Sequence, residues 1–260
     1  MVRRGSDAAW TRYGELDPYF GVVSHDRFRR ENLDDTAVAE FFRSGQTHVD
    51  WLVRTIRDRV DETFAPRRTL DFGCGVGRLL IPLARISHKV VGVDVSEGML
   101  HEARRNCTSH GVLNVELTRS DDRLSRVGGT FDFVHSWIVF QHIPPRRGMA
   151  LLQEIVGRLE GGGIGALHFT YASTAPRSQR ARAWLRSRGP GVNALVNLAR
   201  GRSPSYPVMQ MNAYDLNRIG ALLQAAGCDR LHAHFTDHGG HLGAILVFRK
   251  PRAREADYQP

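Results

Sequence analysis

Cysteine, lysine and long apolar runs are all scarce in this chain of 260 residues. The three cysteines (Cys74, Cys107 and Cys228) are odd in number and too widely spaced for a zinc site or a disulfide framework. No apolar run approaches the ~20 residues of a membrane-spanning helix, and no signal-like segment follows the first residues. The balance of 42% hydrophobic and 24% charged residues excludes a disordered, collagen-like or coiled-coil chain. We therefore expect a cytoplasmic globular protein.

Because lysine occurs only at Lys89 and Lys250, arginine carries the formal net charge of +9. Residues 172–212 hold seven arginines and no acidic residue. Such a segment is most often a solvated surface, but it can also bind phosphate, an acidic glycan, a membrane surface or nucleic acid. Its richness in Arg, Ser, Pro and Gly predicts an insertion or lid. Its apolar residues need a partner, which is the core, the substrate or a second subunit of a homodimer.

From Pro66 onward, short apolar strands alternate with helical patterns, which predicts a doubly wound, mostly parallel α/β sheet. Only five residues separate the last two strands, so these must pair antiparallel. Strands are predicted at 69–72, 90–93, 115–117, 131–134, 165–170, 231–236 and 242–248, and helices at 77–86, 97–110, 146–159 and 214–226.

Residues 1–64 are expected to form an N-terminal arm and helical cap, and residues 65–260 the α/β domain with its insertion at about 172–212. The first 33 residues are aromatic-rich and are predicted to be irregular. A helix is predicted from Asp34–Asp35, ending at Gly45, followed by a second helix over 47–63.

Three glycines at alternating positions follow the first strand, in Leu70-Asp-Phe-Gly-Cys-Gly-Val-Gly-Arg-Leu-Leu80. Glycine lets the backbone turn sharply and approach a ligand closely. In an open α/β sheet, ligands bind beyond the carboxyl ends of the strands, so this loop should face a site. Dinucleotide-binding folds need Gly or Ala where this chain has Arg78, so that pattern fits poorly. The next strand ends at Asp94, whose carboxylate can accept hydrogen bonds from both hydroxyls of a ribose.

The glycine loop led by Asp71 resembles motif I of class I S-adenosylmethionine-dependent methyltransferases. Four later segments resemble further motifs of that family in the same order: 94–99, 120–122, 131–136 and 140–144. The likeness is to the small-molecule and glycan type from bacterial biosynthetic pathways. It implies a seven-stranded, Rossmann-like sheet of order 3-2-1-4-5-7-6 with the last strand antiparallel, helices on both faces, an N-terminal helical cap and an inserted lid.

The resemblance also implies S-adenosyl-L-methionine as the cofactor. Met99 would pack on its adenine, and Asp121, with Asp122 as the alternative, would accept from the adenine amino group. The cofactor-binding residues implied in this way are Asp71, Gly73, Cys74, Gly75, Gly77, Asp94, Val95, Met99, Asp121, Asp122 and Ser136.

Methyl transfer from a sulfonium is an in-line displacement, and a hydroxyl acceptor must lose its proton near the transition state. Histidine suits that role at neutral pH. His142 follows the fourth strand at the expected cofactor edge and is the first candidate base; the alternative is a structural histidine that caps a turn beside Pro144. His168, near the end of the fifth strand, is a candidate substrate-binding residue, unless it only fills the sheet.

The segment Asp237-His-Gly-Gly-His241 joins the last two strands at the same edge. His238 and His241 are therefore further catalytic candidates, as substrate ligands or as a base. With Asp237 they could also hold a divalent metal, but a glycine-containing hairpin turn is favoured over a metal site.

Segments 16–28 and 41–49 resemble the N-terminal region of bacterial methyltransferases that act on glycans and glycosylated metabolites. Tyr13, Tyr19 and Phe20 are accordingly predicted to contact a sugar, together with Tyr171; ordinary packing of an N-terminal arm is the alternative. The favoured function is O-methylation of a sugar, glycan or glycosylated natural product.

N-methylation of an amino-sugar or amine is the second hypothesis, and RNA methylation through the basic lid the third. Nucleic acid is disfavoured because residues 136–140 lack an Asn/Asp-Pro-Pro-Tyr motif and because no cysteine follows a proline. A recognisable RNA-binding module is also absent from the sequence.

Overall fold

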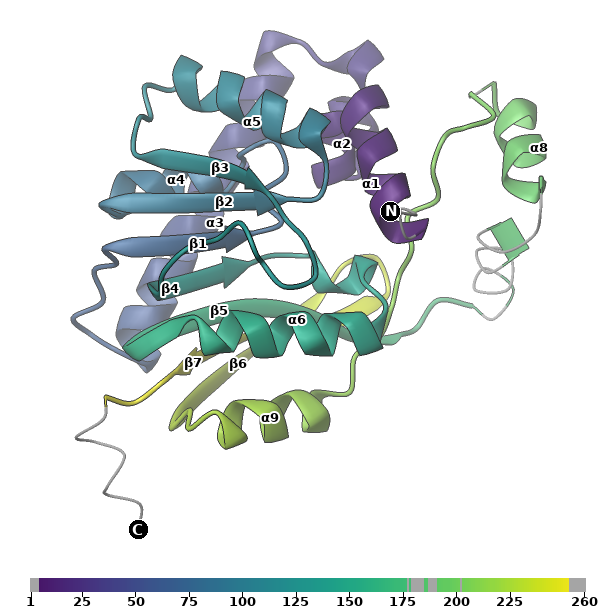
Figure 1. Ribbon diagram of the computed structural model, residues 1–260. Helices are drawn as coiled ribbons and strands as arrows, with labels where there is room; N and C mark the ends of the chain where they lie inside the picture. The colour runs from purple at the N-terminus through teal and green to yellow at the C-terminus, as the bar shows by residue number, and fades with distance from the viewer. Residues whose placement is uncertain (1–4, 177, 179–184, 187–190, 202, 253–260) are drawn as a thin grey trace.

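The computed structural model describes residues 5–176, 178, 185–186, 191–201 and 203–252. Strands β1 to β7 form one sheet of order β3-β2-β1-β4-β5-β7-β6, which confirms the expected order (Figure 1). Only β7 runs against its neighbours, since it pairs antiparallel with both β5 and β6. The strands are β1 (Arg68–Phe72), β2 (Lys89–Asp94), β3 (Val115–Arg119), β4 (Phe131–Ser136), β5 (Leu159–Ser173), β6 (Arg230–Asp237) and β7 (His241–Arg249).

Helices cover both faces of the sheet, because the strands are apolar on both sides. In β7, Ile245 and Val247 pack in one core and Leu246 and Phe248 in the other. The first core is covered by α3 (Asp35–Arg59), α4 (Leu80–Ile86) and α5 (Glu97–Ser109), and the second by α6 (Pro145–Gly157) and α9 (Leu216–Ala225). Among the described residues, no helix combines the length and apolar character needed to cross a membrane.

The N-terminal segment is helical, so the expectation of an irregular first 33 residues was wrong. It forms α1 (Gly5–Leu16), α2 (Pro18–Val22) and two short 3-10 turns, η1 (Asp26–Phe28) and η2 (Arg30–Asn32). Helix α1 lies directly on α5, where a Cβ on Gly14 or on Gly98 would overlap the other helix. This close approach stabilises a helix whose own sequence is only weakly amphipathic.

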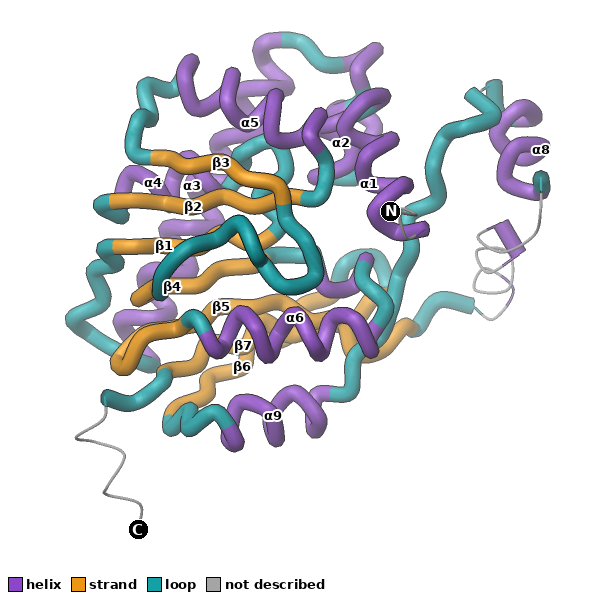
Figure 2. The backbone as a smooth tube through the Cα atoms, viewed as in Figure 1, coloured by secondary structure: helices purple, strands orange, loops and turns teal. Residues whose placement is uncertain are grey.

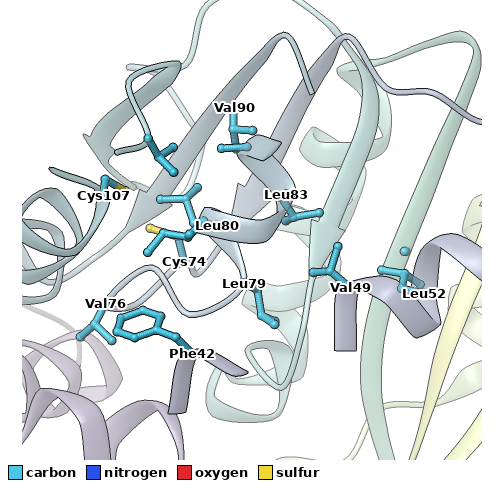
Figure 3. Packing of buried hydrophobic residues seen from close by; sticks show 14 of the residues in the cluster. Phe42, Val49, Leu52, Cys74, Val76, Leu79, Leu80, Leu83, Val90 and Cys107 are labelled. Carbon is cyan, nitrogen blue, oxygen red and sulfur yellow. The ribbon is translucent and has the colours of Figure 1, made fainter. Parts of the chain in front are cut away.

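The predicted helix end at Gly45 was also wrong, since α3 continues unbroken through that position. A Cβ on Gly45 would overlap the carbonyl oxygen of Arg78, just beyond the glycine loop. The glycine therefore serves close packing rather than termination. Figure 3 shows the same contact region, where Phe42 and Val49 of α3 pack toward Val76, Leu79 and Leu83.

The inserted segment leaves the sheet after β5 and returns at α9, and it carries the short helix α8 (Val192–Ala199) (Figure 1). Most of its arginines lie outside the described residues. Leu195 and Leu198 of α8 are exposed. A homodimer, one of the three partners considered for such residues, stays a prediction.

Candidate active site

A cavity of about 820 Å³ opens at the carboxyl ends of the strands. The loops that follow β1, β2 and β4 gather at this edge, together with the β6–β7 hairpin and α1 (Figure 2). Part of the insertion, residues 203–214, runs from the N-terminal helices back to the sheet, and we call it the strap. Met209 and Met211 of the strap line the cavity. The site is thus assembled from segments spread over the whole chain.

The glycine loop forms one wall of the cavity and needs its glycines. Gly73, Gly75 and Gly77 have φ angles of +78°, +53° and +92°, in the region that favours glycine. The amides of Gly73 and Cys74 both donate to the carbonyl of Val93, at 2.8 and 3.0 Å, which fixes the loop on β2. A Cβ on Gly73 would overlap Val139. The loop therefore presents its backbone, without side chains at the glycines, to the cavity; we call this surface the cradle.

Asp94 lies at the end of β2 beside this cradle. Its carboxylate accepts from the amide of Gly75 at 3.1 Å and from that of Ser96 at 2.9 Å. Burial raises the pKa of Asp94 to about 6, although these two hydrogen bonds act in the opposite direction. The carboxylate is thus anchored by backbone donors and still presents lone pairs to the cavity.

The remaining residues implied for the cofactor divide into two groups. Cys74, Val95, Met99 and Asp121 line the cavity with Asp71, Gly73, Gly75 and Asp94, whereas Gly77, Asp122 and Ser136 do not. Ser136 instead donates to the carbonyl of Phe72 at 2.9 Å and ties β4 to β1. Asp122 forms an ion pair with Arg147, and the same guanidinium contacts Asp7 of α1. The assignment of all these residues to a cofactor stays a prediction.

Asp71 is buried and contacts a histidine that the sequence analysis did not single out. His135 stands opposite Asp71 on the neighbouring strand, and its Nδ1 lies 2.8 Å from Asp71 Oδ1. The other oxygen, Oδ2, has no hydrogen-bond partner. The parallel pairing of β1 and β4 is the signal that could have found this pair, since both strands end at the site.

Arg78 is a second residue that sequence reasoning missed as part of the site. In the sequence, Arg78 was only an argument against a dinucleotide-binding pattern. In the structure the residue is 8% exposed and lines the cavity. Nη1 donates to Ser44 Oγ at 3.2 Å, and Nε has no partner. Burial lowers the pKa of Arg78 to about 10, so the guanidinium stays charged at neutral pH.

His142 lines the cavity from the 3-10 turn η3 (Phe140–His142). Its Nδ1 lies 2.7 Å from the carbonyl oxygen of Gln210 in the strap, so Nδ1 carries the proton and donates. Nε2 therefore presents a lone pair, which accepts from Gln141 Nε2 at 3.2 Å. Burial lowers the pKa of His142 to about 4, so the ring is neutral at neutral pH.

The β6–β7 hairpin also reaches the cavity, through His238, Gly239 and His241. Gly239 and Gly240 both have positive φ, as a two-residue hairpin turn requires. The amide of His238 donates to the carbonyl of His241 at 3.1 Å. Burial lowers the pKa of His238, against the influence of Asp237. Both histidines therefore line the cavity.

Behind the hairpin, Trp137 is surrounded by imidazoles. Its ring centroid lies 4.2 Å from that of His48, 4.7 Å from His168 and 5.6 Å from His238. His168 is fully buried, with Nε2 2.8 Å from Thr236 Oγ1, and it does not line the cavity. His168 therefore packs behind the residues that line the cavity and is not itself part of the lining.

The other residues predicted to bind substrate do not line the cavity either. Tyr13 and Tyr19 are buried, and their hydroxyls donate to the carbonyl of Pro207 at 3.1 Å and toward Glu102 at 3.0 Å. The guanidinium of Arg29 covers the ring of Phe20, and Tyr171 packs near Phe235. Trp10 of α1 lines the cavity instead, with its ring 4.8 Å from that of His142.

No group of three His, Cys, Asp or Glu side chains among the described residues could hold a metal ion. The residues present do fit an adenosyl sulfonium with an amino-acid end. The glycine loop leaves room that side chains would fill, Asp94 presents a carboxylate, and the cavity also holds an orphaned oxygen of Asp71 and an orphaned nitrogen of Arg78.

Comparisons with known proteins agree with this geometry. Residues 69–163 match the family model described as "Methyltransferase domain". Over 144 residues the chain is 32% identical to the magnesium-protoporphyrin O-methyltransferase of Synechocystis sp. strain PCC 6803, covering 53% of this chain and 60% of that protein. Over 107 residues it is 33% identical to a ubiquinone biosynthesis O-methyltransferase of Ruegeria sp. strain TM1040, covering 41% of this chain and 42% of that protein.

The chain thus spans less than two thirds of each of these relatives. The crystal structure of magnesium protoporphyrin IX methyltransferase from Synechocystis PCC 6803, with bound SAH, shares the fold. Its TM-score is 0.58 at 21% identity, over 91% of this chain and 98% of that one. Residues 69–163 thus match a methyltransferase domain and the chain shares the fold of this enzyme, so the resemblance stated from the sequence is confirmed.

Proposed function

We propose that this protein is an S-adenosylmethionine-dependent O-methyltransferase that acts on a hydroxyl of a sugar, glycan or glycosylated natural product. The observation that carries the proposal is a single cavity that joins the glycine loop and Asp94 to His142, whose Nε2 presents a lone pair. The matched domain and the two O-methyltransferase relatives support the cofactor and the reaction type.

Bound S-adenosylmethionine would supply a methyl group already activated by a positively charged sulfur. The chain's task is then to hold the acceptor oxygen in line with the methyl carbon and the sulfur, with reacting atoms roughly 3–3.5 Å apart. The acceptor hydroxyl would displace the amide of Gln141 at His142 Nε2. That nitrogen would take the hydroxyl proton as the acceptor oxygen bonds to the methyl carbon and the carbon–sulfur bond breaks.

A hydroxyl acceptor is favoured over an amine by the charges of the cavity. The carboxylates that line it are Asp7, Asp71, Asp94 and Asp121. Asp7 is paired with Arg147, Asp71 is bonded to His135, and Asp121 accepts from Arg123 and Ser125. The ring of Trp10 and the amide of Gln141 contact His142, and Met211 contacts Gln141. These uncharged groups suit an uncharged acceptor better than an ammonium ion.

A sugar as the acceptor is supported by tryptophan rings and imidazoles that line the cavity, and not by the tyrosines predicted from the sequence. Trp10 and Trp137 line the cavity and offer faces on which a sugar can stack. His238 and His241 offer ring nitrogens to hydroxyls. The three free cysteines agree with a reducing cytoplasm as the place of action.

The proposal is tested by transfer of a labelled methyl group from S-adenosylmethionine to three acceptor panels. These are glycosides and other hydroxylated small molecules, amino-sugars and amines, and bulk tRNA. We expect label in the first panel, retained in an alkali-stable ether. Label only in the amine panel, or only in tRNA, would replace the proposal with N-methylation or RNA methylation.

A further inference from the structure

Gln141 carries a buried amide that lies between His142 and strand β5. Its Oε1 accepts a hydrogen bond from Thr170 Oγ1 at 2.6 Å, and its Nε2 lies 3.2 Å from His142 Nε2 and 3.6 Å from Met211 Sδ. Gln141, His142 and Thr170 are all buried. Both polar atoms of the amide thus have partners. The three side chains form one hydrogen-bonded group, which we call the base network.

Two acceptors in the strap set the direction of every hydrogen bond in the base network. The carbonyl oxygen of Gln210 and the thioether of Met211 can only accept, since neither group carries a proton. The carbonyl oxygen therefore puts the ring proton of His142 on Nδ1 and leaves a lone pair on Nε2. Because that lone pair and the thioether both need a donor, the amide turns its nitrogen toward them and its oxygen toward Thr170.

The backbone on both sides of the amide is also fixed. The carbonyl oxygen of Gln141 accepts from the backbone amide of Asn212 at 2.7 Å and from Asn212 Nδ2 at 3.0 Å. The carbonyl oxygen of Thr170 accepts from the amide of Tyr214, at the end of the strap, at 2.8 Å. The amide nitrogen of Gln141 is consequently held in one place, beside the lone pair of His142.

A ligand atom that enters between Gln141 and His142 meets one donor and one acceptor. Gln141 Nε2 donates a proton, whereas His142 Nε2 accepts one. A hydroxyl group satisfies both, because it has one proton to donate and two lone pairs. An ammonium group has protons but no lone pair, so it would leave the buried amide donor without a partner, which is costly.

We propose that Gln141 is a specificity-determining residue that selects a hydroxyl as the acceptor, and that Thr170 is a positioning residue that fixes the direction of its amide. The proposal rests on the proposed function and names the group that favours a hydroxyl over an amine. In the free protein the amide of Gln141 occupies the lone pair of His142. With an acceptor bound, the amide donates to the acceptor oxygen while His142 Nε2 accepts from the hydroxyl.

The first test observes the base network without a ligand, by heteronuclear NMR of the full chain with labelled histidine. The wild type should show a neutral His142 with its proton on Nδ1, in the signals that His142→Gln removes. Gln141→Glu should bring the titration of His142 into the range between about pH 5 and about pH 8, because an adjacent carboxylate raises a histidine pKa by roughly 1–3 units. Gln153→Glu is the matched control, since Gln153 is exposed on α6 and lies outside the cavity.

The wild-type measurement keeps this test independent of whether a variant folds. A wild-type His142 with its proton on Nε2 would overturn the direction of the base network. A folded Gln141→Glu in which His142 titrates as in the wild type would overturn the contact between the two side chains.

The second test compares the hydroxylated acceptor found by methyl labelling with its amine analogue, in which an amino group replaces the accepting hydroxyl. Gln141→Leu should lower the ratio of kcat/KM for hydroxyl over amine about 3–10-fold, the range for one hydrogen bond. Thr170→Val should lower the ratio in the same way, and Thr170→Ser, which keeps the donor, should restore it. An unchanged ratio in Gln141→Leu would overturn the selection and leave the proposed function intact. Wild-type transfer to amines alone would overturn the proposed function itself.

Discussion

The two halves of the cavity are built in different ways. The half proposed to bind the cofactor, here called the cofactor half, comes from loops that follow the adjacent strands β1, β2 and β3, within a single stretch from Asp71 to Asp121. The half proposed to bind the acceptor, here called the acceptor half, comes from α1, η3, the strap and the β6–β7 hairpin, which are far apart in the sequence. One half is fixed by local backbone geometry, and the other only by tertiary packing.

This difference explains why only the cofactor half leaves a motif that can be recognised in the sequence. Turns with positive φ demand glycine, and a strand-end acid such as Asp94 has a fixed place relative to them. These requirements fix both residue types and spacing, so they give a recognisable sequence motif. A pocket assembled from Trp10, His142, Met211 and His241 leaves no spacing to read, because the distances between them are set by folding.

The largest effect is expected in the acceptor half. His142→Ala should lower kcat by roughly 10²–10⁴-fold, the usual contribution of a general base, with little change in cofactor affinity. Steady-state kinetics with the acceptor found in the labelling assay measures this. His88→Ala is the control, because His88 is exposed and lies outside the cavity. Turnover near the wild-type value would remove His142 from the chemistry.

The cofactor half should respond in binding rather than in turnover alone. Asp94→Asn keeps the shape of the side chain but removes the charge that would accept from ribose hydroxyls. Affinity for S-adenosylhomocysteine should fall about 10–10²-fold. The matched control is Asp58→Asn on the exposed surface of α3. An unchanged dissociation constant for Asp94→Asn would contradict the placement of the ribose.

Packing between α3 and the glycine loop gives a prediction about stability. Gly45→Ala introduces a methyl group against the carbonyl of Arg78 and should destabilise the fold by about 1–3 kcal/mol, despite the higher helix propensity of alanine. Gly220→Ala in α9 meets no atom within 4 Å and should be neutral or stabilising by up to about 1 kcal/mol. Thermal denaturation of both variants decides the matter; equal effects would show that Gly45 is not a close-approach site.

The smallest effect is a pH dependence of binding. Because the pKa of Asp94 is raised to about 6, the carboxylate gains a proton as the pH falls through that value and loses an acceptor. Affinity for S-adenosylhomocysteine should drop about fourfold between about pH 7.5 and about pH 5.5. Asp94→Asn should show a flat profile over that range. A wild-type affinity that rises on acidification would mean that the neutral acid is the binding form.

Much of the fold could be predicted from the sequence because the strands are apolar on both faces and the glycines punctuate them. The antiparallel β7 followed from the five-residue link before it. The helix boundary at Gly45 was predicted wrongly, since a glycine needed for close approach looks the same in sequence as one that ends a helix. The helical N-terminal arm was missed because α1 depends on its contact with α5.

The candidate site divides in the same way. Asp71, Gly73 and Asp94 reach the cavity where their motif places them. Arg78 and His135 were missed, because burial and cross-strand pairing give a residue its role only after folding. Tyr13 and Tyr19 were considered for sugar contacts by their type and position alone, and the fold buries them in the core.

The most direct test of the central claim, that this cavity is a cradle for an adenosyl sulfonium compound, is calorimetric titration of the full chain with S-adenosylhomocysteine and, separately, with NAD. Saturable heat of binding is expected with S-adenosylhomocysteine at one site per chain, and no heat of binding with NAD. Binding of NAD without binding of S-adenosylhomocysteine would contradict the claim.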